Sequence, residues 1–331
     1  MKRRDFVSLL SGAAASSALW SRTARAQQDT RVRRIGVLLP YNQQDARWAF
    51  FTTFKERLAG LGWVENRTMR LEIRLTSGNI EEIGKAAAEL VATSPDIIFG
   101  NTNAVAAALK SATTTIPIVF AGVSDPVGGG IVASLSRPGA NVTGFQSGES
   151  EIAGKWLQVL REIAPGIRRV AFVYNPIEPV NVAWLHVAEK VAPSLGVSIS
   201  AVPVGSAAEI EPALTAFAQQ SNSGFVVAPH SVTTGASQLF IALAARLSLP
   251  AIYYFRVFAA RGGLISYGPD IAELYRNGAT YVDRILRGAE PGELPVQLPT
   301  KYQLVINLKT AKVLGITVPP TLLARADEVI E

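Results

Sequence analysis

The 331-residue sequence contains no cysteine and only two histidines. The absence of cysteine excludes disulfide bonds, thiolate metal sites, cysteine nucleophiles and a lipidated cysteine. His186 and His230 are too few for a multi-histidine metal centre, and we expect neither a bound metal nor an organic cofactor. No run of 18 uninterrupted apolar residues occurs, so the sequence predicts no transmembrane helix.

The chain also has little net charge beyond its first 26 residues. Residues 1–26 hold five basic residues against Asp5 alone, a net charge of +4 out of the total of +6. The remaining +2 is spread without a basic stripe interleaved with aromatic residues. We therefore expect no nucleic-acid partner.

Residues 1–26 have the pattern of an export signal. A charged start, "KRRDF", precedes the short apolar stretch "FVSLLSGAAASSALW", and Ala24-Arg25-Ala26 is a small-x-small cleavage site. The Arg3-Arg4 pair followed by Phe6 resembles a twin-arginine signal, although its usual leading Ser or Thr is missing. An ordinary secretory signal is the alternative. Either route predicts cleavage after Ala26 and a freely soluble periplasmic protein.

After residue 30, apolar segments alternate with segments of helical periodicity. In the first half these are "RIGVLLP", "MRLEIRL", "DIIFG", "IPIVFAG" and "VTGF", with helices predicted through Phe51 and Phe54 and over 80–92, 103–111 and about 127–135. The alternation restarts at "RRVAFVYN" and continues through "VSISAVPV", "GFVVAP" and "LPAIYYF". Apolar strands separated by helices predict an α/β fold of parallel sheets covered on both faces.

This repetition predicts two similar lobes. We expect residues 31–142 and about 270–298 to form the first lobe, and residues 143–268 and about 300–331 to form the second. The chain would cross between lobes near Asn141–Thr143, Ser266–Pro269 and Leu298–Tyr302, and its last segment, "PPTLLARADEVIE", reads as a helix. One open sheet of about ten strands, near the upper end of ordinary sheets, is the alternative.

The stretch "FAGVSDPVGGG" raises the question of a nucleotide site. No G-x-x-x-x-G-K-[ST] string occurs, and the first strand leads into "LLPYNQQDARW", which has no glycine for a dinucleotide fingerprint. Ser124 and Asp125 instead lie where a parallel strand ends, and this edge of an open α/β sheet is where ligands bind. The alternative is that they merely cap the helix that follows.

Three segments carry a family resemblance: "RRIGVLLP…FKERLAGLGWVENR", "FAGVSDPVGGGIVASLSRPGANVTG" and the block from "SYGPDIAELYRNG" to the end. They resemble ABC-transporter substrate-binding proteins related to tryptophan- and tyrosine-binding proteins. The resemblance implies a type I periplasmic-binding fold, in which two Rossmann-like lobes joined by crossover strands clamp a small-molecule ligand. It also implies a monomer that delivers its ligand to an ABC permease in the inner membrane.

The resemblance further implies that strand-end loops hold the ligand. Carried over by position, these loops contain sixteen candidate residues: Tyr41, Asn42, Asn101, Thr102, Asn103, Ser124, Asp125, Tyr174, Asn175, Asn181, His230, Ser231, Tyr254, Arg256, Tyr267 and Asp270. Each also has an ordinary reading, as a helix cap, a core aromatic or a surface charge.

The chemistry of the ligand stays open between an amino acid and an aromatic or other organic acid. His230 stands where similar proteins often carry Asp, and Arg256 suits a carboxylate. We expect Arg256 to anchor an acidic group, Asn103 and Ser124 to donate or accept hydrogen bonds, and Tyr41 and Tyr254 to form the walls.

Other functions find less support in the sequence. No G-x-S-x-G elbow or metal-ligand spacing indicates an enzyme, and we expect none. A cleft hydrolase would need two facing acids, such as Asp125 and Asp270. A DNA-binding regulator of the same fold class would need a helix-turn-helix where the export signal lies. An exported sensor that presents its ligand to a receptor is the other alternative.

Overall fold

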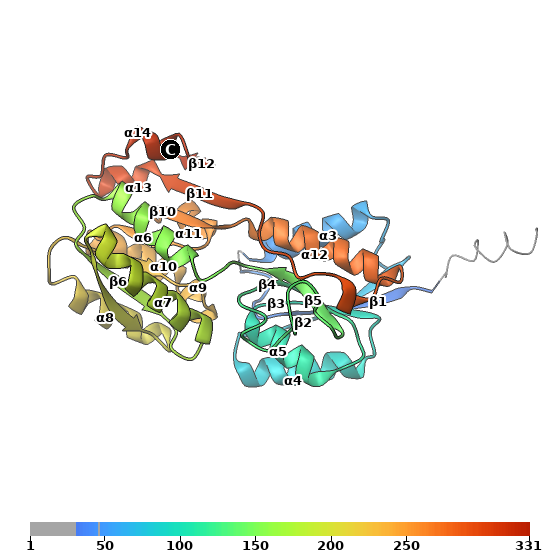
Figure 1. Cartoon of the computed structure of the whole chain (residues 1–331). Helices are drawn as coiled ribbons and strands as arrows, with labels where there is room; N and C mark the ends of the chain where they lie inside the picture. The colour runs from blue at the N-terminus through green and yellow to red at the C-terminus, as the bar shows by residue number, and fades with distance from the viewer. Residues whose placement is uncertain (1–30, 46) are drawn as a thin grey trace, which may run out of the picture.

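The computed structural model describes residues 31–45 and 47–331. The predicted export signal at residues 1–26 and its cleavage site lie outside these residues. The described chain forms two α/β lobes that lie side by side (Figure 1), each built on its own sheet. The predicted fold class is confirmed.

The first lobe has an entirely parallel five-stranded sheet flanked by helices. Its strands, in spatial order, are β2 (Met69–Leu75), β1 (Arg33–Leu39), β3 (Ile97–Asn101), β4 (Ile118–Val123) and β5 (Val142–Gln146). Its helices are α3 (Trp48–Gly60), α4 (Ile80–Ala92), α5 (Asn103–Ala112) and α12 (Ile271–Leu286). A short 3₁₀ turn, η3 (Pro291–Glu293), follows α12.

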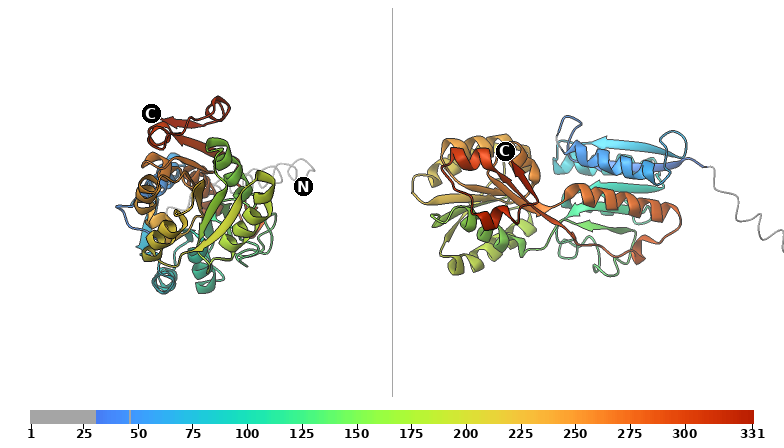
Figure 2. Two further views of the ribbon diagram at one scale, coloured as in Figure 1. Left: turned by 90° about the vertical axis from the view of Figure 1, so that its left-hand side faces the viewer. Right: turned by 90° about the horizontal axis from the view of Figure 1, so that it is seen from above.

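Alternate residues of the strands point to opposite faces of this sheet. Val37 packs in the core beneath α3 and α12, whereas its neighbour Leu38 packs in the core beneath α4 and α5. Gly278 lets α12 approach the sheet, because a Cβ at that position would lie 2.8 Å from a ring carbon of Phe99. A late segment of the chain thus completes the core of the first lobe, as the view from above in Figure 2 shows.

The second lobe has a seven-stranded sheet. Its strands, in order, are β12 (Glu328–Ile330), β11 (Tyr302–Asn307), β10 (Ile265–Pro269), β9 (Ala251–Tyr253), β8 (Ser223–Val227), β6 (Arg169–Tyr174) and β7 (Ser198–Pro203). Only β10 and β11 pair antiparallel. Its helices are α6 (Ile152–Ile163), α7 (Pro179–Val191), α8 (Ile210–Phe217), α9 (Ser231–Gly235), α10 (Ser237–Arg246), α11 (Arg256–Ala260), α13 (Leu308–Val313) and α14 (Pro320–Leu323), with 3₁₀ turns η1 (Ala192–Leu195) and η2 (Ala207–Glu209).

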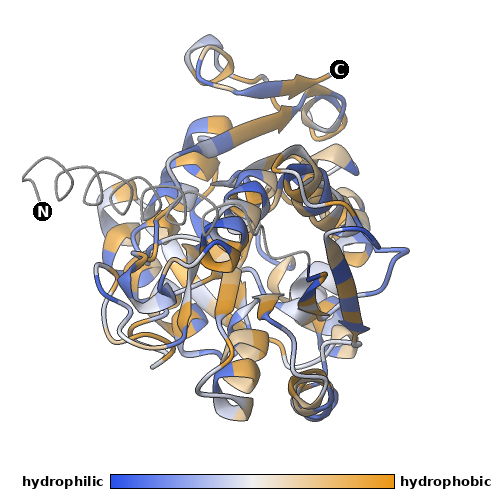
Figure 3. Ribbon diagram, turned by 90° about the vertical axis from the view of Figure 1, so that its right-hand side faces the viewer, coloured by the Kyte–Doolittle hydropathy of each residue, from blue (hydrophilic) through white to orange (hydrophobic). Residues whose placement is uncertain are grey.

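Amphipathic helices bury the faces of both sheets. In the hydropathy view of Figure 3 the helices carry both hydrophobic and hydrophilic residues. Trp156 on α6 and Trp184 on α7 are almost fully buried in the second lobe, with ring centroids 5.6 Å apart in an edge-on contact. Burial of each such side chain contributes about 1.5–3 kcal/mol or more to folding. None of the described helices combines the length and apolar character needed to cross a bilayer.

The chain passes between the lobes three times. It leaves the first sheet after Gln146, returns between β10 and α12, and leaves again after Gln297, which pairs with Phe145 of β5. The first crossing therefore follows Gln146 rather than lying at the expected Asn141–Thr143, because β5 belongs to the first sheet along its whole length.

Two predicted helices are wrong. Residues 126–130 form turns, because Asp125 and Gly130 adopt positive φ angles of 43° and 65° that an α-helix does not allow. The C-terminal segment is a short helix, α14, followed by strand β12, which pairs parallel to β11. Helix α6 was not assigned from the sequence.

Candidate functional site

A cavity of about 520 Å³ lies between the lobes, at the carboxyl ends of the parallel strands of both sheets. This is the edge at which α/β sheets bind ligands. At the rim the lobes approach each other closely, since a Cβ built at Gly78 would lie 3.5 Å from the Cβ of Ser231. Nine of the sixteen candidate residues line the cavity: Asn101, Thr102, Asn103, Ser124, Asn175, Asn181, His230, Ser231 and Tyr254. Ligand contact by these residues stays a prediction.

The N-terminus of α5 borders the cavity in the first lobe. Thr102, its N-cap, has φ 70° and ψ 156° and makes no side-chain cap hydrogen bond. The first N–H groups of a helix lack intrahelical partners and carry a partial positive charge. Asn101, which precedes this turn and is 9% exposed, has a buried Oδ1 without a hydrogen-bond partner. This wall therefore has donors at the helix end and one buried acceptor that lacks a partner.

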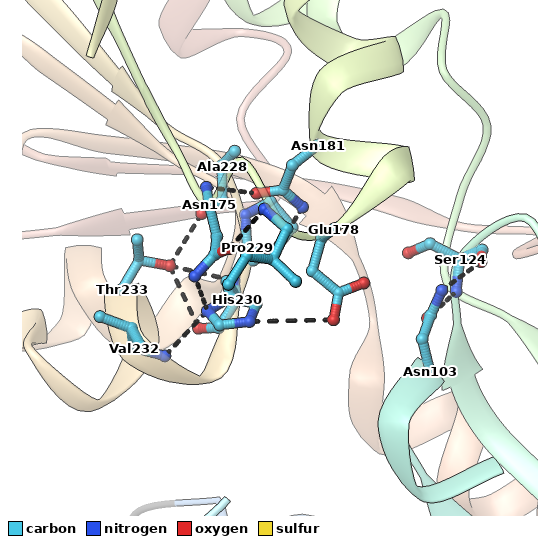
Figure 4. A network of polar contacts seen from close by, with 11 residues as sticks. Asn103, Ser124, Asn175, Glu178, Asn181, Ala228, Pro229, His230, Val232 and Thr233 are labelled. Atoms are coloured by element: carbon cyan, nitrogen blue, oxygen red, sulfur yellow. Dashed lines mark hydrogen bonds and ion pairs between the residues drawn. The ribbon is translucent and has the colours of Figure 1, made fainter. Parts of the chain in front are cut away.

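Asn103 and Ser124 are bonded to each other. The Ser124 amide donates to Asn103 Oδ1 at 2.9 Å, and Asn103 Nδ2 donates to the Ser124 carbonyl at 2.8 Å (Figure 4). The Ser124 hydroxyl also lies 2.6 Å from the Ser147 hydroxyl, at the first interlobe crossing. These bonds join the ends of β3 and β4 to the hinge, so both side chains position the wall of the cavity.

Asn175 and Asn181 similarly shape the wall of the second lobe. The Asn175 amide donates to Asn181 Oδ1 at 3.1 Å, and Asn181 Nδ2 donates to the Pro229 carbonyl at 3.2 Å (Figure 4). The loop after β6 is thereby tied to the loop after β8. This tie places the next residue, His230, at the edge of the cavity.

His230 is held as a neutral imidazole in one tautomer. It is the N-cap of α9, and its Nδ1 accepts a hydrogen bond from the Val232 amide at 3.2 Å, so the ring proton is assigned to Nε2. Burial lowers the pKa of His230 to about 4. At pH 7 its Nε2–H is a hydrogen-bond donor rather than a cation.

Glu178 supplies the carboxyl group of the second-lobe wall. Its Oε1 lies 3.8 Å from His230 Nε2, too far for a hydrogen bond, and its side chain is 24% exposed. Burial raises the pKa of Glu178. Among the residues that the structure describes, no Lys or Arg pairs with this carboxyl, and the neutral His230 does not neutralise it.

Aromatic side chains form the apolar part of the cavity. Phe50, Tyr254, Phe255 and Tyr275 all line it. The Tyr254 hydroxyl donates to the Ser147 carbonyl and links the second lobe to the hinge. Tyr41, expected as a wall, lies behind the cavity, where its hydroxyl is 2.8 Å from that of Tyr275.

The structure places seven candidates outside the lining: Tyr41, Asn42, Asp125, Tyr174, Arg256, Tyr267 and Asp270. Arg256 is on the surface, where its guanidinium pairs with Glu328 at 2.5–2.6 Å. Its expected role as an anchor for an acidic ligand does not fit this position. Arg256 instead pairs with Glu328 on the edge strand β12. The sequence predicts a helix for this segment.

Several of the remaining outer residues have local structural roles. Asn42 Oδ1 accepts bonds from the amides of the following turn, and Asp125 Oδ1 accepts one from Gly128 at 2.9 Å. Asp270 caps α12 through the Glu273 amide. The hydrolase alternative required Asp125 and Asp270 to face each other in the cavity, and neither lines it.

The aromatic candidates outside the lining pack in the second lobe. Tyr267 stacks on Tyr302 with ring centroids 5.8 Å apart, and Tyr174 contacts the ring of Phe172. In the described chain, no group of three or more His, Asp or Glu residues could hold a metal ion.

Four important lining residues are not among the candidates predicted from the sequence: Arg47, Phe50, Glu178 and Tyr275. Glu178 lies within the loop "YNPIEPVN", of which only the tyrosine and asparagines were singled out. Arg47 and Phe50 begin the helix after β1, and a cavity at the ends of the strands predicts that the first turn of that helix would reach it. Tyr275 comes from α12, more than a hundred residues later, and had no local signal.

The model of the ABC transporter substrate binding protein family matches residues 34–330. Among curated proteins, the tyrosine-binding protein of Clostridioides difficile (strain R20291) is 22% identical over 262 residues, covering 79% of this chain and 75% of that protein. The family and these relatives are solute-binding proteins rather than enzymes.

Solved structures share the fold. A conserved domain protein from Vibrio cholerae is 30% identical with a TM-score of 0.83, covering 90% of this chain and 100% of that one. An ABC domain from Streptococcus pneumonia in complex with L-Trp is 23% identical with a TM-score of 0.84, covering 91% and 100%. The ligand-free, open structure of a Clostridium difficile substrate-binding protein with adhesive properties has a TM-score of 0.69 at 20% identity, covering 91% and 99%.

Proposed function

Because this chain belongs to the ABC transporter substrate-binding protein family, we propose that it captures an amino acid with an apolar or aromatic side chain. The observation that carries the proposal is the unpaired Glu178 carboxyl in the cavity. In the view of Figure 4 this carboxyl lies between His230 and the Asn103–Ser124 pair of the other lobe. A partly buried carboxylate without a cationic partner favours a ligand that brings one.

A ligand ammonium group would supply the cation that Glu178 lacks. It would pair with Glu178 and donate a further hydrogen bond to the free Oδ1 of Asn101. The ligand carboxylate would then face the uncapped N-terminus of α5, where helix N–H groups stabilise anions. Phe50 and Tyr275 would enclose the apolar side chain. Each polar group of the ligand therefore meets a group of the cavity that lacks a partner.

The relatives support the same class of ligand. One is named as a tyrosine-binding protein, and another was solved in complex with L-Trp. The sequence left an organic acid equally open because of His230 and Arg256. With Arg256 on the surface and Glu178 in the cavity, the balance favours an amine-bearing ligand.

Delivery of this amino acid to an inner-membrane ABC permease completes the proposed function. The protein would act as a monomer in the periplasm after cleavage at Ala26, with Arg3-Arg4 directing twin-arginine export. Replacement of both arginines by lysine would then stop export, and mass spectrometry of the periplasmic protein would find Gln27 at its N-terminus.

Isothermal titration calorimetry with three matched compounds tests the choice of ligand. L-phenylalanine has both polar groups, 3-phenylpropanoate lacks the amine and phenethylamine lacks the carboxylate. We expect L-phenylalanine to bind and each truncated compound to bind at least about 100-fold more weakly, because a buried charged partner is left unsatisfied. Equal affinity for 3-phenylpropanoate would overturn the amino-acid assignment in favour of an organic acid.

A further inference from the structure

The inference concerns Arg47, the one arginine among the residues that line the cavity. It lies at the N-cap of α3, directly before the turn that carries Phe50. Its side chain is 16% exposed, so the guanidinium is largely removed from solvent. A buried arginine at this position requires partners that fix it.

Asp45 and Tyr41 hold the guanidinium in place. Arg47 Nε and Nη2 donate to the two oxygens of Asp45 at 2.9 and 2.8 Å. The guanidinium carbon lies 4.7 Å from the centre of the Tyr41 ring, in a cation–π contact. Although desolvation acts to raise it, the hydrogen bonds from Arg47 lower the pKa of Asp45 overall. The pair is thus ionised and its net charge is zero.

One end of the guanidinium remains for a ligand. Asp45 occupies Nε and Nη2, and the side-chain Nη1 donates to no described group. Because Asp45 already balances the charge of the guanidinium, Nη1 can donate to a neutral oxygen without needing a second carboxylate. A ligand that has only carbon atoms, or only an N–H donor, at this point leaves Nη1 unsatisfied.

The strand order separates the loop that carries Arg47 from the loops of the head-group site. Arg47 follows β1, whereas the α5 N-terminus follows β3 and Ser124 follows β4, in the order β1-β3-β4. Neighbouring strands are about 4.8 Å apart, so the end of β1 lies roughly 5–10 Å along the wall from the ends of β3 and β4. That span matches the distance from the α-carbon of a phenylalanine-like ligand to a substituent on its ring.

We infer that Arg47 is a specificity-determining residue that selects amino acids with a hydrogen-bond acceptor at the far end of the side chain. This inference rests on the proposed function, since it places the amino-acid head group at Glu178 and α5. A phenol oxygen or a ring carboxylate supplies the acceptor. An unsubstituted phenyl ring does not.

Calorimetry with L-phenylalanine, L-tyrosine and para-carboxy-L-phenylalanine tests the inference. We expect the two acceptor-bearing amino acids to bind the wild-type protein about 10-fold more tightly than L-phenylalanine, the usual effect of one hydrogen bond to a charged group. The double variant Asp45→Asn/Arg47→Met removes both charges together. It should abolish this preference, so that the three amino acids bind the variant with affinities within about twofold of one another.

A second variant guards against misfolding. Arg47→Lys keeps the charge opposite Asp45 but loses the planar fork, and it should lose most of the preference. Equal affinities of the wild type for L-phenylalanine and L-tyrosine would overturn the inference and leave the proposed function intact. If either folded variant still binds L-tyrosine more tightly than L-phenylalanine, the inference is also overturned and the proposed function stands. If none of the three amino acids binds the wild type, the proposed function and the inference both fail.

Discussion

The two lobes present different kinds of polar wall to the same cavity. In the first lobe the polar side chains are bonded among themselves, as Arg47 is to Asp45 and Asn103 is to Ser124. In the second lobe Glu178 and His230 lie 3.8 Å apart, and burial displaces the pKa of each from its ordinary value. The charged side chains of the first-lobe wall are paired before a ligand arrives, whereas the Glu178 carboxyl of the second-lobe wall is not.

This difference assigns separate tasks to the lobes. The first lobe offers a fixed pattern of donors and shape, because its charges are balanced and its loops are tied to the hinge. The second lobe holds a carboxyl whose ionisation is unfavourable until a cation arrives. We therefore expect substitutions in the second-lobe wall to change which charge is bound, and substitutions in the first-lobe wall to change affinity more modestly.

The largest expected effect is that of Glu178→Gln. It should weaken L-phenylalanine binding by about 100- to 1,000-fold, because the ammonium loses its only anionic partner. The raised pKa of Glu178 means that its contribution to stability is lost as pH rises through that pKa. The empty variant should therefore melt no lower than wild type at pH 7. Calorimetry and thermal melts measure both effects.

The control is Glu189→Gln, an exposed position on α7, the helix that Glu178 precedes, and it should change neither quantity. A Glu178→Gln protein that retains full affinity would show that the ammonium lies elsewhere and that the second-lobe wall does not select charge.

His230 predicts a pH-dependent stability. Its pKa is about 4 in the folded protein and about 6.5 when unfolded, so its contribution is complete above pH 6.5 and declines as pH falls to 4. The loss is roughly 2–3 kcal/mol over that window, at 1.4 kcal/mol per unit. His230→Asn keeps an N-cap acceptor without the titration. Urea unfolding should find a shallower acid decline in this variant, and identical pH profiles would contradict the buried neutral histidine.

A smaller effect is expected for Asn101 in the first-lobe wall. Asn101→Ala removes the unpartnered Oδ1 and should weaken L-phenylalanine binding about 10-fold. Affinity for 3-phenylpropanoate, which has no ammonium, should not change. Calorimetry with both compounds separates this role from a general loss of fold, and an equal loss for both would contradict it.

The smallest effect is expected for Arg256→Ala. Its exposed ion pair with Glu328 lies outside the cavity, and such pairs contribute about 0–1 kcal/mol. Affinity for L-phenylalanine should stay within about twofold of wild type, where the sequence alone had suggested a large loss for an acidic ligand. A loss above 10-fold would return Arg256 to the binding site.

Patterns within single segments allowed most of the fold to be predicted. The apolar runs around Val37 and Phe172 gave the central strands, and their repetition gave the two lobes. The predicted helix after Asp125 failed because positive φ angles decide that turn. The predicted C-terminal helix failed because pairing with β11 outweighs the helical pattern of "LLARADEVIE".

The candidate site was predictable only to the level of its loops. Strand-end position placed Asn101, His230 and Tyr254 at the cavity. Position alone could not show that Arg256 points away from the cavity, because its side chain follows its ion pair with Glu328, which only the tertiary structure brings near. Tyr275 lies on α12, which reaches the cavity only because it packs in the first lobe in the tertiary structure, and no local sequence pattern marks this residue.

The position of α12 has a consequence for the order in which the protein folds. The first lobe needs Leu274, Tyr275 and Val282 for its core, yet its own strands end at Gln146, and α12 begins only at Ile271. At about 5–20 residues per second, a ribosome takes roughly 6–25 s to synthesise the residues between these two points. During that time Phe54 and Phe99 lack the helix that covers them. The nascent first lobe therefore stays incomplete until most of the second lobe has been synthesised, and a chain truncated before α12 lacks the Tyr275 that lines the first-lobe wall of the cavity.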